Sequence, residues 1–117
     1  MAVYKIFPEK DATLYSEYPN MNSGIDEIIE ATTSTETDGG EPAVSRFLIK
    51  FSQSEIEDVL TNKIGTSSFQ SNLKTYIADV TGLNSTTTLE VYPTSGSWNM
   101  GTGKYSSEPQ TQNGVCW

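Results

Sequence analysis

Hydrophobic and polar side chains alternate along residues 44–51. The odd positions hold Ser45, Phe47, Ile49 and Phe51, and the even positions hold Val44, Arg46, Leu48 and Lys50. Successive side chains of a β-strand point to opposite faces, so this order predicts a strand with one apolar face and one face that carries two cations. A pairing shifted by one residue would bury both cations. We therefore predict a central strand of a two-layer β domain, with Phe47, Ile49 and Phe51 in its core.

Further segments carry the β-branched and aromatic residues that are typical of strands. These segments are residues 3–7, 25–31, 69–80 and 86–92. Pro8 and Pro93 are expected to end the first and the last of them, because proline donates no hydrogen bond to a ladder. Periodicity alone does not distinguish a strand from a helical turn over residues 25–31, but the short length and the pair Ile28 and Ile29 favour a strand. The longest of these segments, residues 69–80, is expected to pair within the same core.

A helix signal follows the central strand. Ser52 and Glu55 match the capping box, in which the serine hydroxyl accepts a hydrogen bond from an amide of the first turn. The pattern predicts a short helix over about residues 52–62 that stops before Gly65. The apolar positions Ile56, Val59 and Leu60 fall on one side of it. We expect that side to cover one open end of the sandwich.

Length and composition favour a single all-β domain. The chain has 117 residues, and its 35% of hydrophobic residues are clustered rather than dispersed. Clustering favours a thin sandwich core over disorder. Residues 94–114 are too poor in aliphatic side chains for strands, and Val-Cys-Trp then stands where a strand should start. We therefore interpret residues 1–117 as one β-sandwich domain and expect it to be the N-terminal or ordered part of a longer polypeptide.

The net charge, the absence of His and the single Cys exclude several classes of function. The formal net charge of −8 repels phosphate, so we expect no nucleic-acid partner. The chain has no His and a single cysteine, Cys116, which excludes His-containing zinc clusters, Ser-His and Cys-His catalytic pairs and an intrachain disulfide. No feature separates the pKa values of two carboxyls as glycoside hydrolysis requires. We therefore expect no enzyme.

The chain shows neither a secretory signal nor a membrane span. Residues 1–5 lack the basic and apolar regions of a signal peptide, and no apolar run approaches the roughly 20 residues that cross a bilayer. We therefore expect synthesis in a cytoplasm and no membrane partner. Residues 32–42 contain no hydrophobic residue and predict a solvated loop or hairpin tip, the alternative being a binding loop that a partner orders.

Short motifs carry a family resemblance through their order along the chain. They are residues 10–14 (Lys-Asp-Ala-Thr-Leu), 22–24 (Asn-Ser-Gly), 45–51, 89–92 (Leu-Glu-Val-Tyr) and 97–103 (Ser-Trp-Asn-Met-Gly-Thr-Gly). In this order they resemble the jelly-roll modules related to carbohydrate-binding modules. The version with Tyr-Ser-Glu-Tyr-Pro and Gly-Ile-Asp-Glu-Ile-Ile is similar to virion structural proteins of tailed bacteriophages, notably those of cyanobacterial phages. The closing C-terminal strands of the complete module are lacking.

This resemblance implies a fold and a role. The fold would be a jelly-roll-like antiparallel β-sandwich with one short helix after the central strand. The role would be a non-enzymatic structural component of a tailed phage particle, present in several copies and in contact with other virion proteins. The particle position would be the tail, the neck, a fibre attachment or a capsid decoration. An acidic chain without a signal peptide would fold in the host cytoplasm and leave inside the virion by lysis.

Asp11, Asn22 and Asp26 are the candidate metal ligands. Ca²⁺ is bound by carboxylate and amide oxygens of irregular loops, and these residues lie in or near the loop at residues 18–24. The alternative is that Asx residues in such a loop act as turn formers and caps, which is their commoner role and the one we favour. Apart from calcium, no cofactor is expected.

Trp98, Tyr105 and Met100 are the candidate binding residues in the polar last quarter of the chain. Sugars stack on aromatic faces, and the same side chains are frequent centres of protein interfaces. A third interpretation is that Trp98 folds back as a lid on the sandwich. Between the two binding roles we favour a protein contact, because a module short of its last strands suggests that a neighbouring subunit completes it. The alternative function is a carbohydrate-binding or host-recognition module with a surface glycan as its partner.

Overall fold

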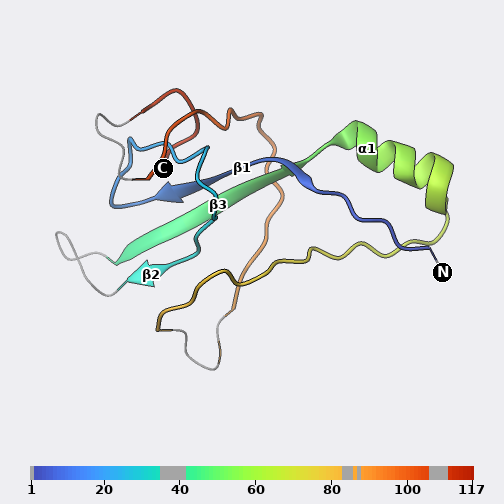
Figure 1. Cartoon of the computed structure of the whole chain (residues 1–117), viewed down its shortest axis with the longest axis horizontal. Coiled ribbons are helices and arrows are strands. Elements are labelled where there is room, and N and C mark those ends of the chain that lie inside the picture. The colour runs from blue at the N-terminus through green and yellow to red at the C-terminus, as the bar shows by residue number, and fades with distance from the viewer. Residues whose placement is uncertain (1, 35–41, 83–85, 87, 106–110) are drawn as a thin grey trace.

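The regular structure is mostly strand, with one antiparallel sheet and one short helix (Figure 1). The computed structural model describes residues 2–34, 42–82, 86, 88–105 and 111–117. In chain order its elements are β1 (Pro8–Tyr15), β2 (Thr33–Ser34), β3 (Ala43–Phe51), the helix α1 (Gln53–Asp58) and the π-helical segment η1 (Val59–Ile64). Residues 35–41 of the predicted loop lie outside the described residues.

The sheet has the strand order β1-β3-β2, and both pairings are antiparallel. Leu14 lies opposite Arg46 and Lys10 lies opposite Lys50, with an irregularity between Pro8 and Lys10. The pairing of β2 with β3 is short and reaches only Val44. Residues that lie opposite each other share a face, so from Lys10 onward the odd-numbered side chains of β1 and β3 form one face, the odd face, and the even-numbered ones form the even face.

The predicted central strand is confirmed as β3, and the odd face is the better covered one. Ala43 and Ser45 are buried, whereas Arg46 and Lys50 on the even face are exposed. Phe47, Ile49 and Phe51 are only half-buried, so the expected core around them is open. The physical reason is that no second sheet lies over this end of β3 in the described part of the chain.

The buried residues gather at the Tyr15 end of β1 and, apart from Tyr15 and Met21, are small or polar. They are Ala12, Thr13, Tyr15, Met21, Asn22, Ser23, Ala43 and Ser45. Segments from the last quarter of the chain reach this end and lie beside residues 16–32 (Figure 1). A region with so few large apolar side chains depends on satisfied hydrogen bonds, because an unpaired buried polar group costs about 1–3 kcal/mol.

The other predicted strands do not form. In the described part of residues 3–7, 25–31, 69–80 and 86–92 there is no ladder pairing, and β1 begins at Pro8 instead of ending there. Large apolar side chains stay in solvent as a result, with Leu73 48% and Ile77 76% exposed. Periodicity identifies the apolar side of such a segment, but a strand also needs a neighbour to accept its backbone hydrogen bonds.

The predicted helix is confirmed in its position and differs in its contacts. The Ser52 hydroxyl accepts from the Glu55 amide at 3.4 Å, and the helical segment ends at Gly65, where φ is 84°. From Val59 onward the segment is π-helical. It extends away from the sheet (Figure 1), so Ile56 remains exposed and covers no sandwich end.

The chain is extended and exposes much of its surface. Its radius of gyration is 16.9 Å, whereas a compact domain of this length has about 13 Å. Its accessible surface is 9409 Å², which exceeds the roughly 6,300 Å² of a compact monomer of this mass by about 3,100 Å². The described residues include no helix that is long and apolar enough to span a bilayer. A closed two-layer sandwich therefore stays a prediction.

Candidate functional site

The carboxamide of Asn22 joins three separate stretches of backbone. Its Nδ2 donates to the carbonyls of Met100 at 2.7 Å and Val115 at 2.9 Å. Its Oδ1 accepts from the amides of Gly103 at 2.8 Å and Gly24 at 3.2 Å. An amide side chain offers two donors and one oxygen with two lone pairs, so its hydrogen-bonding capacity is filled. We call this arrangement the Asn22 junction.

Glycines allow the backbone to approach the junction closely. A Cβ on Gly101, Gly103 or Gly114 would collide with Asn22, and a Cβ on Gly24 would collide with the Met100 carbonyl. Gly101 also has φ 80°, in the left-handed region that other residues rarely adopt. The motif Asn-Ser-Gly and the pair Gly101 and Gly103 therefore belong to one packed unit. Sequence reasoning recognised both motifs but not their contact.

Ser23 closes the outer edge of β1. Its hydroxyl accepts from the Thr13 amide at 3.0 Å and donates to the Thr13 carbonyl at 2.6 Å. These are the backbone groups that a neighbouring strand would otherwise bond, so the side chain stands in for a strand. The junction therefore lies directly against the sheet.

Tyr105 packs on the odd face beside the junction. Its ring centroid lies 5.0 Å from that of Tyr15 and 6.0 Å from that of Tyr18, and its amide donates to both carboxylate oxygens of Asp26. Burial, followed by the hydrogen bond to the Glu30 carboxylate, raises the pKa of Tyr15 well above its usual range. Burial, followed by the neighbouring Tyr18, also raises the pKa of Tyr105. This tyrosine cluster attaches the last quarter of the chain to β1.

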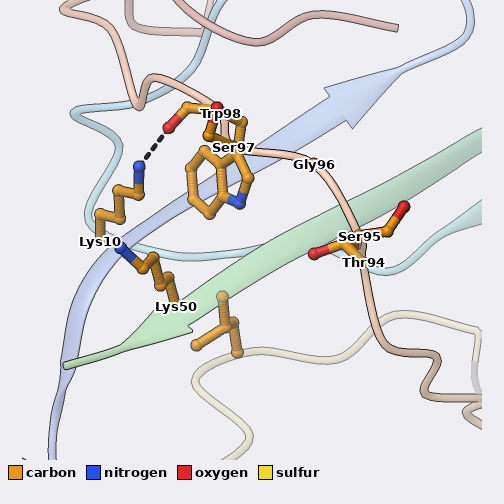
Figure 2. A pocket seen from close by; sticks show the side chains of 8 residues that line it. Lys10, Lys50, Thr94, Ser95, Gly96, Ser97 and Trp98 are labelled. Atoms are coloured by element: carbon orange, nitrogen blue, oxygen red, sulfur yellow. Dashed lines mark hydrogen bonds between the residues drawn. The ribbon is translucent and has the colours of Figure 1, made fainter. Parts of the chain in front are cut away.

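Trp98 lies on the even face, against Lys10 (Figure 2). The Lys10 ammonium lies 4.4 Å from the centroid of the indole and donates a hydrogen bond to the Trp98 carbonyl. Cation–π contacts of this kind contribute about 0.5–1 kcal/mol at exposed sites. The indole is half-buried, so part of its surface remains accessible.

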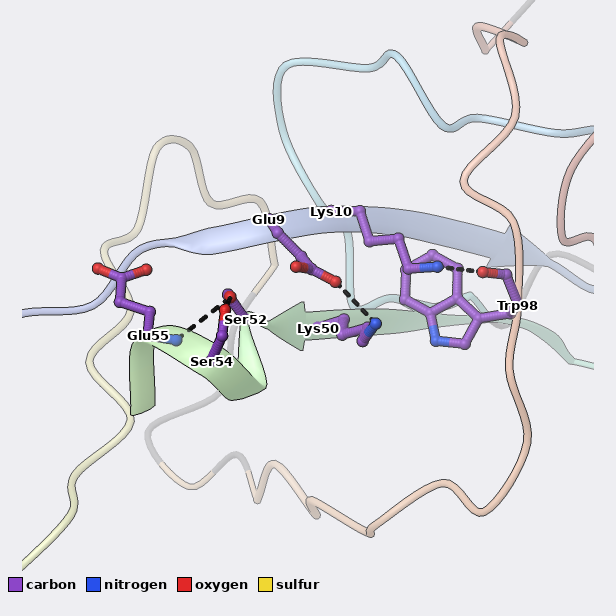
Figure 3. Close-up of polar contacts among 7 residues, drawn as sticks. All are labelled: Glu9, Lys10, Lys50, Ser52, Ser54, Glu55 and Trp98. Carbon is purple, nitrogen blue, oxygen red and sulfur yellow. Dashed lines mark hydrogen bonds and ion pairs between the residues drawn. The ribbon is translucent and has the colours of Figure 1, made fainter. Parts of the chain in front are cut away.

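A hollow of about 310 Å³ opens beside this indole. It is lined by Lys10, Ile49, Lys50 and residues 94–98. Lys50 is held at its rim by an ion pair with Glu9 at 2.8 Å (Figure 3), and both side chains are partly exposed. The hollow thus offers one aromatic surface, small polar residues and two cations.

A second indole covers the same even face. The Arg46 guanidinium lies 4.8 Å from the ring centroid of Trp117, so Arg46 stacks on an aromatic ring. Sequence reasoning missed the roles of Lys10 and Trp117. The only available signal was the presence of cations on a strand face and indoles elsewhere, and these partners lie far apart along the chain.

The structure does not bring the predicted binding residues together. Trp98 contacts Lys10 on the even face, whereas Tyr105 contacts Tyr15 on the odd face, so the two rings do not form one platform. Met100 is half-buried, and its carbonyl belongs to the Asn22 junction. Of the three, Trp98 alone lines the hollow. A binding role for any of them stays a prediction.

The candidate calcium ligands have protein partners of their own. The Asn22 oxygen accepts two amides, and both Asp26 oxygens accept from the Tyr105 amide. Burial raises the pKa of the Asp11 carboxyl, so its surroundings disfavour its negative charge. Within the described residues, no group of three or more His, Cys, Asp or Glu side chains is placed to hold a metal. The calcium site stays a prediction that none of these contacts supports.

Comparisons with family models, with curated proteins and with solved structures find no match to this chain.

Proposed function

We propose that the chain is a non-enzymatic structural component of a tailed phage particle, located in the tail, the neck, a fibre attachment or a capsid decoration, and that it acts through contacts with other virion proteins. The observation that carries this proposal is the accessible surface of 9409 Å². The excess of about 3,100 Å² over a compact monomer is larger than the roughly 800 Å² that each partner buries in a standard protein interface.

The exposed side chains support an assembly role of this kind. Large apolar residues such as Val91 (67% exposed) and Tyr92 (73% exposed) lie in solvent in the single chain. Apolar surface on this scale favours association, because each Å² removed from water contributes about 25 cal/mol. In the proposed role, neighbouring subunits supply the missing layer of a jelly-roll-like sandwich, and several copies are present in one virion.

The alternative is a carbohydrate-binding or host-recognition module, and the hollow beside Trp98 favours it specifically. An indole flanked by Ser95, Ser97 and Lys10 could stack on a sugar ring and donate hydrogen bonds to its hydroxyl groups. A surface glycan would then be the partner. This candidate uses only the small hollow and leaves the large exposed apolar surface unexplained.

The first experiment follows the chain into particles. Phage particles would be purified from lysed host cells by density gradient, and the chain would be quantified by mass spectrometry and located by electron microscopy. The proposal expects a fixed copy number per particle above one. Recovery of the chain only in the soluble part of the lysate would overturn it.

A second experiment separates the two functions with a matched pair of variants. Trp98→Ala and Trp117→Ala each remove an indole stacked on a cation of the even face, but only Trp98 lines the hollow. A host polysaccharide would be titrated by calorimetry. Loss of measurable affinity in Trp98→Ala alone would support the glycan function, and an absence of affinity in the unaltered chain would eliminate it.

A further inference from the structure

One edge of β3 is open. The Ser16 amide donates to the Val44 carbonyl, and the Val44 amide donates to the Ser16 hydroxyl, so the backbone groups of even residues of β3 face β1. The Ser45 amide donates in the opposite direction, to the Thr32 carbonyl at 3.0 Å. By the alternation of an antiparallel ladder, the amides and carbonyls of Phe47, Ile49 and Phe51 face the same side as those of Ser45.

Nothing in the described part of the chain bonds to that edge beyond Ser45. The pairing of β2 stops at Val44, and no described residue shares a backbone hydrogen bond with Phe47, Ile49 or Phe51 on this side. The opposite edge of the sheet is closed at Thr13 by the Ser23 hydroxyl. An open edge with half-buried apolar side chains is a template for an added strand.

Residues 69–80 have the complementary features. They have no regular secondary structure, with a bend at Ala78, and within the described residues they make no backbone–backbone hydrogen bond. Leu73, Thr75 and Ile77 alternate with Lys74 and Tyr76, the same period of two as in β3. The segment lies apart from β3 of its own chain in Figure 1.

We propose that residues 69–80 of one copy add as a strand to the open edge of β3 in a second copy, and that the second copy returns the same contact. This inference rests on the proposed assembly role and names a partner for it, a second copy of this chain. Both halves of the contact are present in every chain, so a reciprocal pair satisfies both of them at once.

Area and charge fit this occupant. Paired obligate subunits bury about 2,000–5,000 Å² in total, and the excess surface of one chain of 9409 Å² already amounts to about 3,100 Å². Residues 69–80 carry one cation, Lys74, and one acid, Asp79, so the segment brings no share of the net charge of −8 into the contact. Arg46 and Lys50 beside the edge are opposite in sign to the net charge of the incoming copy.

The experiment measures the mass of the full chain in solution and the position of the contact. Light scattering would be compared for the unaltered chain, for Thr75→Pro and for the control Thr66→Pro, which places the same residue outside the proposed strand. Both threonines are exposed, so neither change should disturb the rest of the fold, as circular dichroism would check. Proline removes a hydrogen bond from a ladder and is excluded from the interior of paired strands, so Thr75→Pro should weaken dimerisation by about 100-fold, and Thr66→Pro should not.

Cross-linking locates the contact independently. A photo-cross-linker at position 75 would be activated in a mixture of isotopically heavy and light chains. Cross-links from heavy to light chains that end on residues 45–51 are expected. A monomer at all concentrations, cross-links within one chain, or cross-links to another surface would each overturn the inference. A monomer that still enters particles overturns only this inference, whereas a dimer that is absent from particles overturns only the proposed function.

Discussion

Asn22 shows how one polar side chain can organise a region that lacks a large apolar core. It is fully buried, and its four hydrogen bonds reach residues 24, 100, 103 and 115. Removing one partner from such a buried site costs more free energy than a single hydrogen bond contributes, because the remaining donor or acceptor stays buried without a partner. Losing this carboxamide should therefore weaken the attachment of residues 100–103 and 115 to the sheet even where the tyrosine cluster and the stacked indoles remain.

Asn22→Asp should destabilise the chain strongly with almost no change in shape. The new carboxylate would face the carbonyl oxygens of Met100 and Val115, which lose their donors. We expect a loss of about 3 kcal/mol or more in the free energy of unfolding, measured by urea denaturation at a fixed chain concentration.

Asn113→Asp is the matched control. Asn113 is exposed and, among the residues that the structure describes, bonds only Thr102, whose amide and hydroxyl can both donate to a carboxylate. We expect its cost to stay below about 0.5 kcal/mol. Equal costs for the two variants would contradict the role assigned to the junction.

Asp11 gives a prediction with a defined pH dependence. Burial raises the pKa of the Asp11 carboxyl, so the folded chain favours its protonated form more than the unfolded chain does. The stabilisation that results is fully present below the unfolded pKa and is lost as the pH rises through the folded pKa. Asp11→Asn should therefore raise the midpoint of thermal unfolding at neutral pH, and the gain should vanish toward about pH 3.

The exposed Glu27→Gln serves as the control and should leave the midpoint unchanged. The same variants test the calcium hypothesis. If Asp11 were a calcium ligand, added Ca²⁺ would raise the midpoint of the unaltered chain, and Asp11→Asn would abolish that rise.

At the scale of elements, regular structure forms where a strand has a neighbouring strand to pair with or where capping residues mark a helix. The segment around Gly101 has neither regular structure nor apolar content, yet it packs tightly because a glycine permits both its backbone angle and its approach to Asn22. Two separate physical effects, backbone strain and collision, therefore act at the same position.

Gly101→Ala and Gly82→Ala separate these effects. Both glycines have positive φ, 80° and 69°, but a Cβ on Gly82 meets nothing within 4 Å. Gly82→Ala should cost about 1 kcal/mol from strain alone, and Gly101→Ala should cost about 2 kcal/mol beyond that from overpacking. Urea denaturation of both variants measures the difference, and equal costs would show that the collision relaxes freely.

Sequence reasoning succeeded where the signal is local. The alternation around Phe47 predicted β3, and Ser52 and Gly65 marked the ends of the helical segment. It failed for residues 69–80, because a period of two indicates which side chains share a face but not whether a partner strand exists in the same chain. The Asn22 junction was out of reach for another reason, since its bonds to Met100 and Val115 join positions 78 and 93 residues apart.

At the scale of the whole molecule, the chain is open and extended rather than a closed globule. Its extents of 52 × 37 × 24 Å and its exposed apolar residues leave a surface that association would cover. A net charge of −8 on every copy opposes such association at low ionic strength. Hydrophobic attraction and charge repulsion therefore act against each other when copies meet.

Stability should consequently depend on chain concentration and on salt. We expect the midpoint of thermal unfolding to rise with concentration, because association stabilises only the folded chain, and to rise further when salt screens the repulsion. Differential scanning calorimetry over a dilution series measures both effects. A midpoint that is independent of concentration would contradict the interpretation of this chain as a subunit.

Trp98 and Trp117 are the only tryptophans of the chain, and they lie on the same face of the sheet, over Lys10 and Arg46. Intrinsic fluorescence therefore reports almost exclusively on whether the C-terminal quarter is attached to β1 and β3. Detachment of that quarter from β1 and β3 would change the fluorescence emission before the sheet itself unfolds.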